Sequence, residues 1–189
     1  MKYKLLIMVS GGVFALTACN RNQDATTNAD LNVAIDNSME ANVATEAGPT
    51  MSQDFVNAAA ASDKFEIESS KLAAAAGASP AVKSFADNMI SAHTDSTAKL
   101  KSTVAGMNPP LTPDDSLNAD QQTALDGLKG KTGAAFDTAY AAAQVDAHQK
   151  TLDALKAYSA AGDNVALKSF ADGLIPTVTA HLNTAKGLK

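Results

Sequence analysis

The chain has 189 residues, which is enough for one domain with accessory segments and too short for two full domains. Hydrophobic residues make up 46% of the chain but aromatic residues only 5%, so the composition favours closely packed helices over a β-sandwich or barrel. The formal net charge is −5 and Arg21 is the only arginine, which argues strongly against nucleic acid as a partner. The single cysteine excludes an internal disulfide framework.

The first eighteen residues have the pattern of a lipoprotein signal peptide. A basic head precedes an apolar run of about 14 residues, which is too short to span a bilayer comfortably. The run ends in Leu16-Thr17-Ala18-Cys19, which resembles a bacterial lipobox. In proteins with that signal, the leader peptide is cut before the cysteine and the cysteine carries lipid. We therefore expect the membrane as a partner through lipidated Cys19; an ordinary secretory leader is the alternative. The residue after the cysteine is Asn20, whereas an aspartate at that position would resemble the signal that retains lipoproteins in the inner membrane. By this resemblance we expect an outer-membrane lipoprotein that faces the periplasm of a Gram-negative cell.

Residues 19–52 form a segment of different composition. They are rich in Asn, Asp, Thr and Ala and contain no aromatic residue. Such a segment cannot bury enough apolar surface to offset the entropy lost on ordering. The sequence therefore predicts a flexible acidic tether between the lipid anchor and the domain.

From Asp54 onward the chain has the periodicity of amphipathic helices. Gly77-Ala-Ser79-Pro80 predicts the end of one helix and the start of the next, with Ser79 as N-cap and Pro80 at the first helical position. Three prolines in the 108–115 stretch predict a loop that no helix could cross. The expected helices cover residues 53–76, 80–105, 117–129 (a weaker helix), 134–160 and 164–187.

The helical region repeats itself. The segment from Gly77 to Asp87 matches the segment from Gly162 to Asp172 at a constant offset of 85 residues, and Phe85 and Phe170 fall on equivalent core positions. Neither helical hairpin could bury its apolar stripe alone, so the sequence predicts an all-α four-helix bundle over residues 53–188. The long 106–133 connection, with its short extra helix, leaves both a crossover and an up-and-down topology open.

All three histidines of the chain, His93, His148 and His181, fall on the apolar faces of their helices and near the middle of them. Glu66 lies at a similar depth, at the margin of the apolar face of the first helix. These four side chains predict a metal site at the centre of the bundle, and nitrogen-rich ligation suits a single Zn, Cu, Fe or Ni ion. Two alternatives remain: histidines that only pack in the core, and a pH-sensitive element.

A di-iron site is the weakest interpretation. Di-iron four-helix bundles use Glu-x-x-His on two helices, whereas the residues three before each histidine are Ile90, Val145 and Val178. The sequence therefore does not favour a ferritin-like oxidoreductase, and we expect no enzyme activity.

Residues 53–188 resemble the domain-of-unknown-function 4142 family of bacterial exported proteins, which are placed among ferritin-like four-helix folds. The resemblance rests mainly on Phe65-Glu66-Ile67, Val82-Lys-Ser-Phe-Ala-Asp-Asn-Met-Ile90 and the stretch from Leu167 to Leu182. It supports the fold and an envelope location, and Glu66 matches the family's glutamate on the first helix. The family's usual Asp-His pairs are Ala92-His93 and Ala147-His148 here, and the nearby Asp95 and Asp146 are candidates to replace the missing aspartates as supporting residues.

The leading hypothesis is therefore a lipid-anchored periplasmic bundle that binds one metal ion or small ligand, or that senses envelope conditions. The alternative is a structural or interaction module that contacts another envelope protein. A metal site predicts that the three imidazoles converge within about 5 Å of one point, whereas a module predicts scattered imidazoles and an exposed apolar patch.

Overall fold

The computed structural model describes residues 50–77 and 79–188. The predicted signal peptide, Cys19 and nearly all of the predicted tether lie outside these residues. In the described part, no helix is both long enough and apolar enough to cross a membrane.

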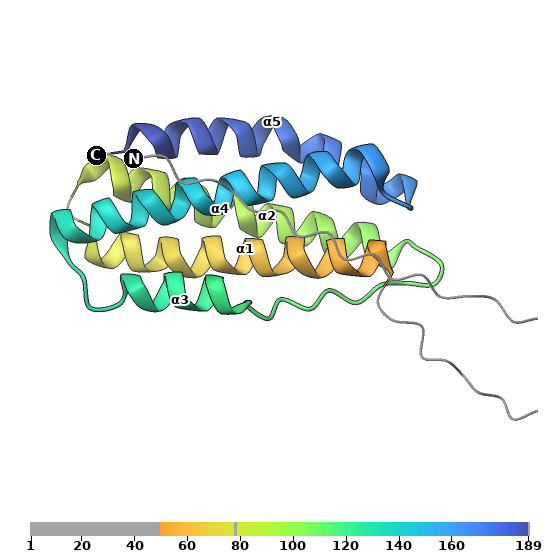
Figure 1. Ribbon diagram of the computed structural model, residues 1–189, viewed down its shortest axis with the longest axis horizontal. Coiled ribbons are helices and arrows are strands. Elements are labelled where there is room, and N and C mark those ends of the chain that lie inside the picture. The colour runs from red at the N-terminus through yellow and green to blue at the C-terminus, as the bar shows by residue number, and fades with distance from the viewer. Residues whose placement is uncertain (1–49, 78, 189) are drawn as a thin grey trace, which may run out of the picture. The chain divides into compact units, whose positions relative to one another are not determined.

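The described residues form five helices and their connections, and they contain no strand. The all-α prediction is confirmed, and each predicted helix is present with ends shifted by one or two residues (Figure 1). The helices are α1 (Met51–Ala76), α2 (Pro80–Ala105), α3 (Ala119–Leu128), α4 (Gly133–Ala161) and α5 (Val165–Gly187).

The boundaries of the two hairpins repeat at the same offset as the sequence. Gly77 ends α1 and Gly162 ends α4, each donating its backbone N–H to a carbonyl four residues earlier. The N-caps are equivalent as well, since Ser79 Oγ accepts from Val82 N at the start of α2 and Asn164 Oδ1 accepts from Ala166 N at the start of α5. Local capping chemistry therefore builds the same helical hairpin twice.

The connection between α2 and α4 runs the length of the bundle, alongside α1 (Figure 1). It leaves α2 near the start of α1, where Gln53 Nε2 donates to the Thr112 carbonyl at 2.8 Å. It reaches α4 near the opposite end of α1, where Ser79 N donates to Asp137 Oδ2 at 2.8 Å. As a result α1 packs against α2 and α4, and α5 packs against α4 and α2. This is the crossover topology of ferritin-like bundles, since an up-and-down bundle would place α2 beside α4.

The apolar core is divided into two clusters by a polar layer. Phe55, Leu100 and Tyr158 belong to the cluster at one end, where the rings of Phe55 and Tyr158 stack with centroids 4.0 Å apart. Val82 and Phe136 belong to the cluster at the other end. On α1, α2 and α4, buried polar side chains occupy the stretch between the two clusters. The layer consists of Asp63, Glu66, Ser69, His93, Gln144 and His148.

Candidate metal centre

The three histidines come together in this polar layer. One ligand atom from each of His93, His148 and His181 lies within 4.8 Å of the other two. The ring centroids are 5.5 to 5.9 Å apart, so each imidazole lies next to both of the others, tilted or edge-on to them. His93 and His148 are buried, and His181 is half-buried. Three helices, α2, α4 and α5, each supply one histidine to the cluster.

Hydrogen bonds at Nδ1 orient two of the rings. His93 Nδ1 donates to Asp63 Oδ1 at 2.8 Å, and Asp63 Oδ2 in turn accepts from Thr97 Oγ1 at 3.1 Å. His148 Nδ1 donates to the Gln144 carbonyl at 2.9 Å. Because a carbonyl or a carboxylate can only accept, Nδ1 carries a proton in both rings, and Nε2 is the nitrogen that has a lone pair for a metal when the ring is neutral. This is the arrangement in which metal-bound histidines are usually held.

The lone pairs that remain are buried without hydrogen-bond partners. His93 Nε2, His148 Nε2 and His181 Nδ1 each lie out of contact with solvent and bond to no other group in the described chain. Buried polar atoms are nearly always paired, because an unmade hydrogen bond costs about 1–3 kcal/mol. Three such nitrogens in one small volume therefore fit a shared cation, and this donor set suits a nitrogen-preferring transition metal.

Glu66 lies behind His148, away from the three converging nitrogens. Its Oε1 is 3.5 Å from His148 Nδ1, the nitrogen already used for the Gln144 carbonyl. Neither carboxylate oxygen of Glu66 has a hydrogen-bond partner in the described part of the chain. The structure therefore puts Glu66 in the polar layer, as the sequence predicts, but beside the histidine cluster and not in it.

Burial and neighbouring charge determine the protonation states. Burial, together with the nearby His93, lowers the pKa of His148 to about 3 and that of His181 to about 4. Burial also acts to lower the pKa of His93, but the hydrogen bond to Asp63 and the charges of Glu66 and Asp63 outweigh it and raise that pKa. Burial raises the pKa of the Glu66 carboxyl to about 7. At neutral pH His148 and His181 are thus in the neutral form that binds a metal.

Asp95 and Asp146 do not take the supporting positions suggested for them. Both side chains are exposed, and Asp146 pairs with Lys150 at 2.9 Å on the outer face of α4. The carboxylate that supports a histidine is Asp63, one helix away from His93. The sequence contains one signal for Asp63, an acidic residue three positions before Glu66 on the same helix. The helical wheel alone does not fix which neighbouring helix that residue faces.

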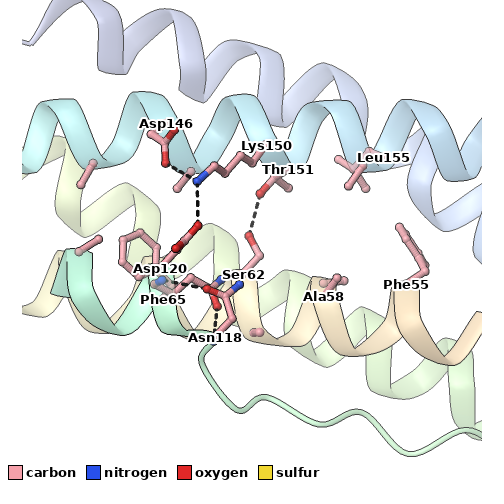
Figure 2. A pocket seen from close by; sticks show the side chains of 17 residues that line it. Phe55, Ala58, Ser62, Phe65, Asn118, Asp120, Asp146, Lys150, Thr151 and Leu155 are labelled. Carbon is pink, nitrogen blue, oxygen red and sulfur yellow. Dashed lines mark hydrogen bonds and ion pairs between the residues drawn. The ribbon is translucent and has the colours of Figure 1, made fainter. Parts of the chain in front are cut away.

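An open groove lies on the outside of the bundle between α1, α3 and α4 (Figure 2). Its volume is about 300 Å³, and its walls are mostly alanines together with Phe55, Phe65 and Leu155. Ser62 and Thr151 point toward one another across it, with their hydroxyl oxygens 2.8 Å apart. Lys150, held by Asp146 and Asp120, lies over the groove. The groove does not reach the histidines, which lie on the inner side of the Ser62–Thr151 pair.

The topology and the central layer define this protein as a ferritin-like four-helix bundle with a buried cluster of three histidines. By sequence, the chain belongs to the family described as Domain of unknown function (DUF4142), whose model matches residues 37–188. The resemblance predicted from the sequence is therefore confirmed.

Two solved structures are similar in fold. One is described as CopM in the Cu(II)-bound form, with a TM-score of 0.60, 16% sequence identity, and coverage of 71% of this chain and 93% of that chain. The other is CopM in the Cu(I)-bound form, with a TM-score of 0.59, 17% identity, and coverage of 71% and 92%. A comparison with curated proteins found no significant match.

Proposed function

We propose that this protein binds one transition-metal ion, with copper preferred, through Nε2 of His93, Nε2 of His148 and a ring nitrogen of His181. The observation that carries the proposal is the convergence of three ligand atoms, one from each histidine, within 4.8 Å of one another. In two of these rings, those of His93 and His148, a hydrogen bond at Nδ1 leaves Nε2 as the nitrogen for the metal. A cation placed among these nitrogens would satisfy three buried lone pairs at once.

The surrounding residues prepare the site in different ways. Asp63 and the Gln144 carbonyl hold two imidazoles in the ligating tautomer, so little ordering remains to be done when the ion binds. Burial keeps His148 and His181 neutral, while the raised pKa of His93 means that a proton competes more strongly with the metal at that ring. The two apolar clusters close the polar layer at both of its ends along the bundle.

The choice of copper rests on ligand chemistry and on the similar folds. Imidazole nitrogen suits copper, zinc, iron and nickel, and for a given site Cu²⁺ binds most tightly of the divalent first-row ions. The two structures of similar fold are described as copper-bound forms. Together these favour copper over the other three ions.

Metal content tests the proposal. The purified full chain is exposed to an equal mixture of copper and zinc, dialysed and measured by mass spectrometry, beside His148→Ala and the control Asp146→Asn. Asp146 is exposed and lies two residues from His148 on the same helix, so Asp146→Asn alters the same part of α4 without changing a ligand. We expect about one copper per chain in the unaltered protein and in the control, and none in His148→Ala. Equal metal in all three would overturn the proposal.

We also propose that the chain is held to the outer membrane by lipid on Cys19, facing the periplasm. The support is the Leu16-Thr17-Ala18-Cys19 sequence at the end of the apolar run. Acyl chains contribute about 0.8 kcal/mol per buried methylene, so several chains together anchor a protein stably. The amino-terminal peptide of the mature protein should begin at Cys19 and exceed its sequence mass by that of the lipid, and Cys19→Ser should no longer yield this peptide. Recovery of an unmodified Cys19 peptide from the unaltered protein would contradict the proposal.

If no metal binds, the interaction module of the cell envelope becomes the better account, and a search for an envelope protein partner is then the appropriate next experiment. In that case the histidine cluster would serve packing alone.

A further inference from the structure

A small cavity touches the histidine cluster on one side. It lies between α1, α2, α4 and α5 and has a volume of about 40 Å³. His93, His181 and Asp63 all line it, whereas His148 does not. The cavity therefore opens along the edge of the cluster that joins His93 to His181.

The cavity has room for a small ligand and side chains that would hold one. A space of about 10–15 Å³ accommodates one water molecule when polar partners surround it. Four of the residues that line this cavity carry hydroxyl groups, namely Ser62, Ser96, Thr151 and Thr177. A hydroxyl can donate or accept, so this wall can stabilise either a neutral ligand or a small anion.

The cavity also reaches the surface. Thr177 on α5 is exposed, and Ala92 and Ser96 on the facing side of α2 are partly exposed. The opposite wall is closed by the Ser62–Thr151 hydrogen bond, which separates the cavity from the outer groove in Figure 2. Access from solvent to the histidines is therefore between α2 and α5.

Among the histidine, cysteine and acidic side chains of the described residues, only the three histidines converge here, and neither buried carboxylate of the layer joins them. Glu66, the remaining buried acidic group on α1, lies on the Nδ1 side of His148 and does not line the cavity. Metal sites with three protein ligands characteristically keep a fourth position for water or another exogenous ligand.

We propose that the bound metal keeps one coordination position open toward this cavity, where it takes a water molecule or a small monovalent anion from solvent through the α2–α5 opening. The inference rests on the metal site proposed above. The proposed ligands are small, exchangeable molecules or ions that bind through oxygen or nitrogen. A closed site with four protein ligands would not accept them.

The test uses azide as the probe. The full chain is loaded with Cu(II), and azide is titrated while visible absorption and electron paramagnetic resonance are recorded. Azide bound directly to Cu(II) should add a charge-transfer band and change the resonance spectrum. The Ala92→Leu variant, which fills the cavity mouth, should weaken azide binding at least about tenfold while copper still binds at one per chain.

A matched variant and a second blocking variant accompany the titration. Ala58→Leu is the matched control, because Ala58 lines the outer groove and not the cavity (Figure 2). It adds the same side chain and should leave azide binding unchanged.

Thr177→Leu blocks the same opening from α5 and replaces Ala92→Leu if that variant does not fold. A copper-loaded chain whose spectra do not respond to azide, or equal azide affinity in the blocked and unaltered chains, would overturn this inference alone. Failure of the unaltered chain to take up copper would overturn the metal site and this inference with it.

Discussion

The two hairpins share a scaffold and differ at the centre. Their helix caps and their buried Phe85 and Phe170 are equivalent at an offset of 85 residues. In the polar layer the equivalence breaks down, because Asp63 of the first hairpin corresponds in position to His148 of the second. The repeated sequence thus determines the caps and core positions of both hairpins, and the candidate site lies where the two hairpins differ in sequence.

The difference separates two roles. The α1–α2 hairpin supplies both carboxylates of the polar layer and one histidine, His93, whose pKa they raise. The α4–α5 hairpin supplies two histidines whose pKa values burial lowers. One hairpin thus orients a ligand and raises its pKa, while the other supplies two ligands that burial keeps neutral.

Removal of the equivalent phenylalanines should show that the shared scaffold is symmetric. Phe85→Ala and Phe170→Ala each delete a ring that is at most 4% exposed, so each should lower the free energy of unfolding by about 3–5 kcal/mol. Urea denaturation monitored by circular dichroism measures both. A loss below about 1 kcal/mol in one variant and a full loss in the other would show that the two hairpins are not equivalent in packing.

Removal of a ligand should show that the centre is not symmetric. His181 is the half-buried member of the cluster, so His181→Ala should still fold. Its copper affinity should drop by more than about 100-fold, which is the largest loss usual for removal of a residue that only supports a metal ligand. Competition with a chelator of known affinity measures the drop. The control is Val178→Ala, which removes the second hairpin's equivalent of His93 without touching a ligand. A similar loss of affinity in both variants would assign the effect to packing.

Asp63→Asn tests the supporting role of the first hairpin. Copper affinity at pH 8 should fall about 10–100-fold, because Asn holds the His93 ring less firmly, whereas exposed Asp95→Asn should have no effect. The pH profile separates electrostatics from structure. Asp63 raises the pKa of His93, so a proton competes with copper from a higher pH in the unaltered chain. In Asp63→Asn only the charge of Glu66 still opposes burial, so the pKa of His93 should be lower than in the unaltered chain and the fall in affinity should begin at a lower pH. An unshifted profile would contradict this role.

The smallest effect expected is at the equivalent N-caps. Ser79→Ala removes the side-chain acceptor for Val82 N, and Asn164→Ala removes that for Ala166 N and Leu167 N. Each substitution should cost about 1 kcal/mol of unfolding free energy. Thermal denaturation of both variants measures it, and an unchanged midpoint in either would mean that water replaces the cap there.

Local rules were sufficient for the helices, and geometry between helices was not. Glycines, caps and prolines marked all five helices, and periodicity placed His93, His148 and His181 on inner faces. Periodicity gives the direction of a side chain around its own axis and not the rotation of one helix against another. For that reason Asp63 as the partner of His93, Glu66 behind His148 and the crossover of the connection emerged only from the packed structure.

The most direct test of the central claim is X-ray absorption spectroscopy of the copper-loaded full chain, which counts the imidazoles bound to one ion. The account predicts one copper per chain with three imidazole nitrogens in its coordination shell, and two in His148→Ala if any copper remains. A shell with no more than one imidazole in the unaltered chain would contradict the claim that His93, His148 and His181 form a single site.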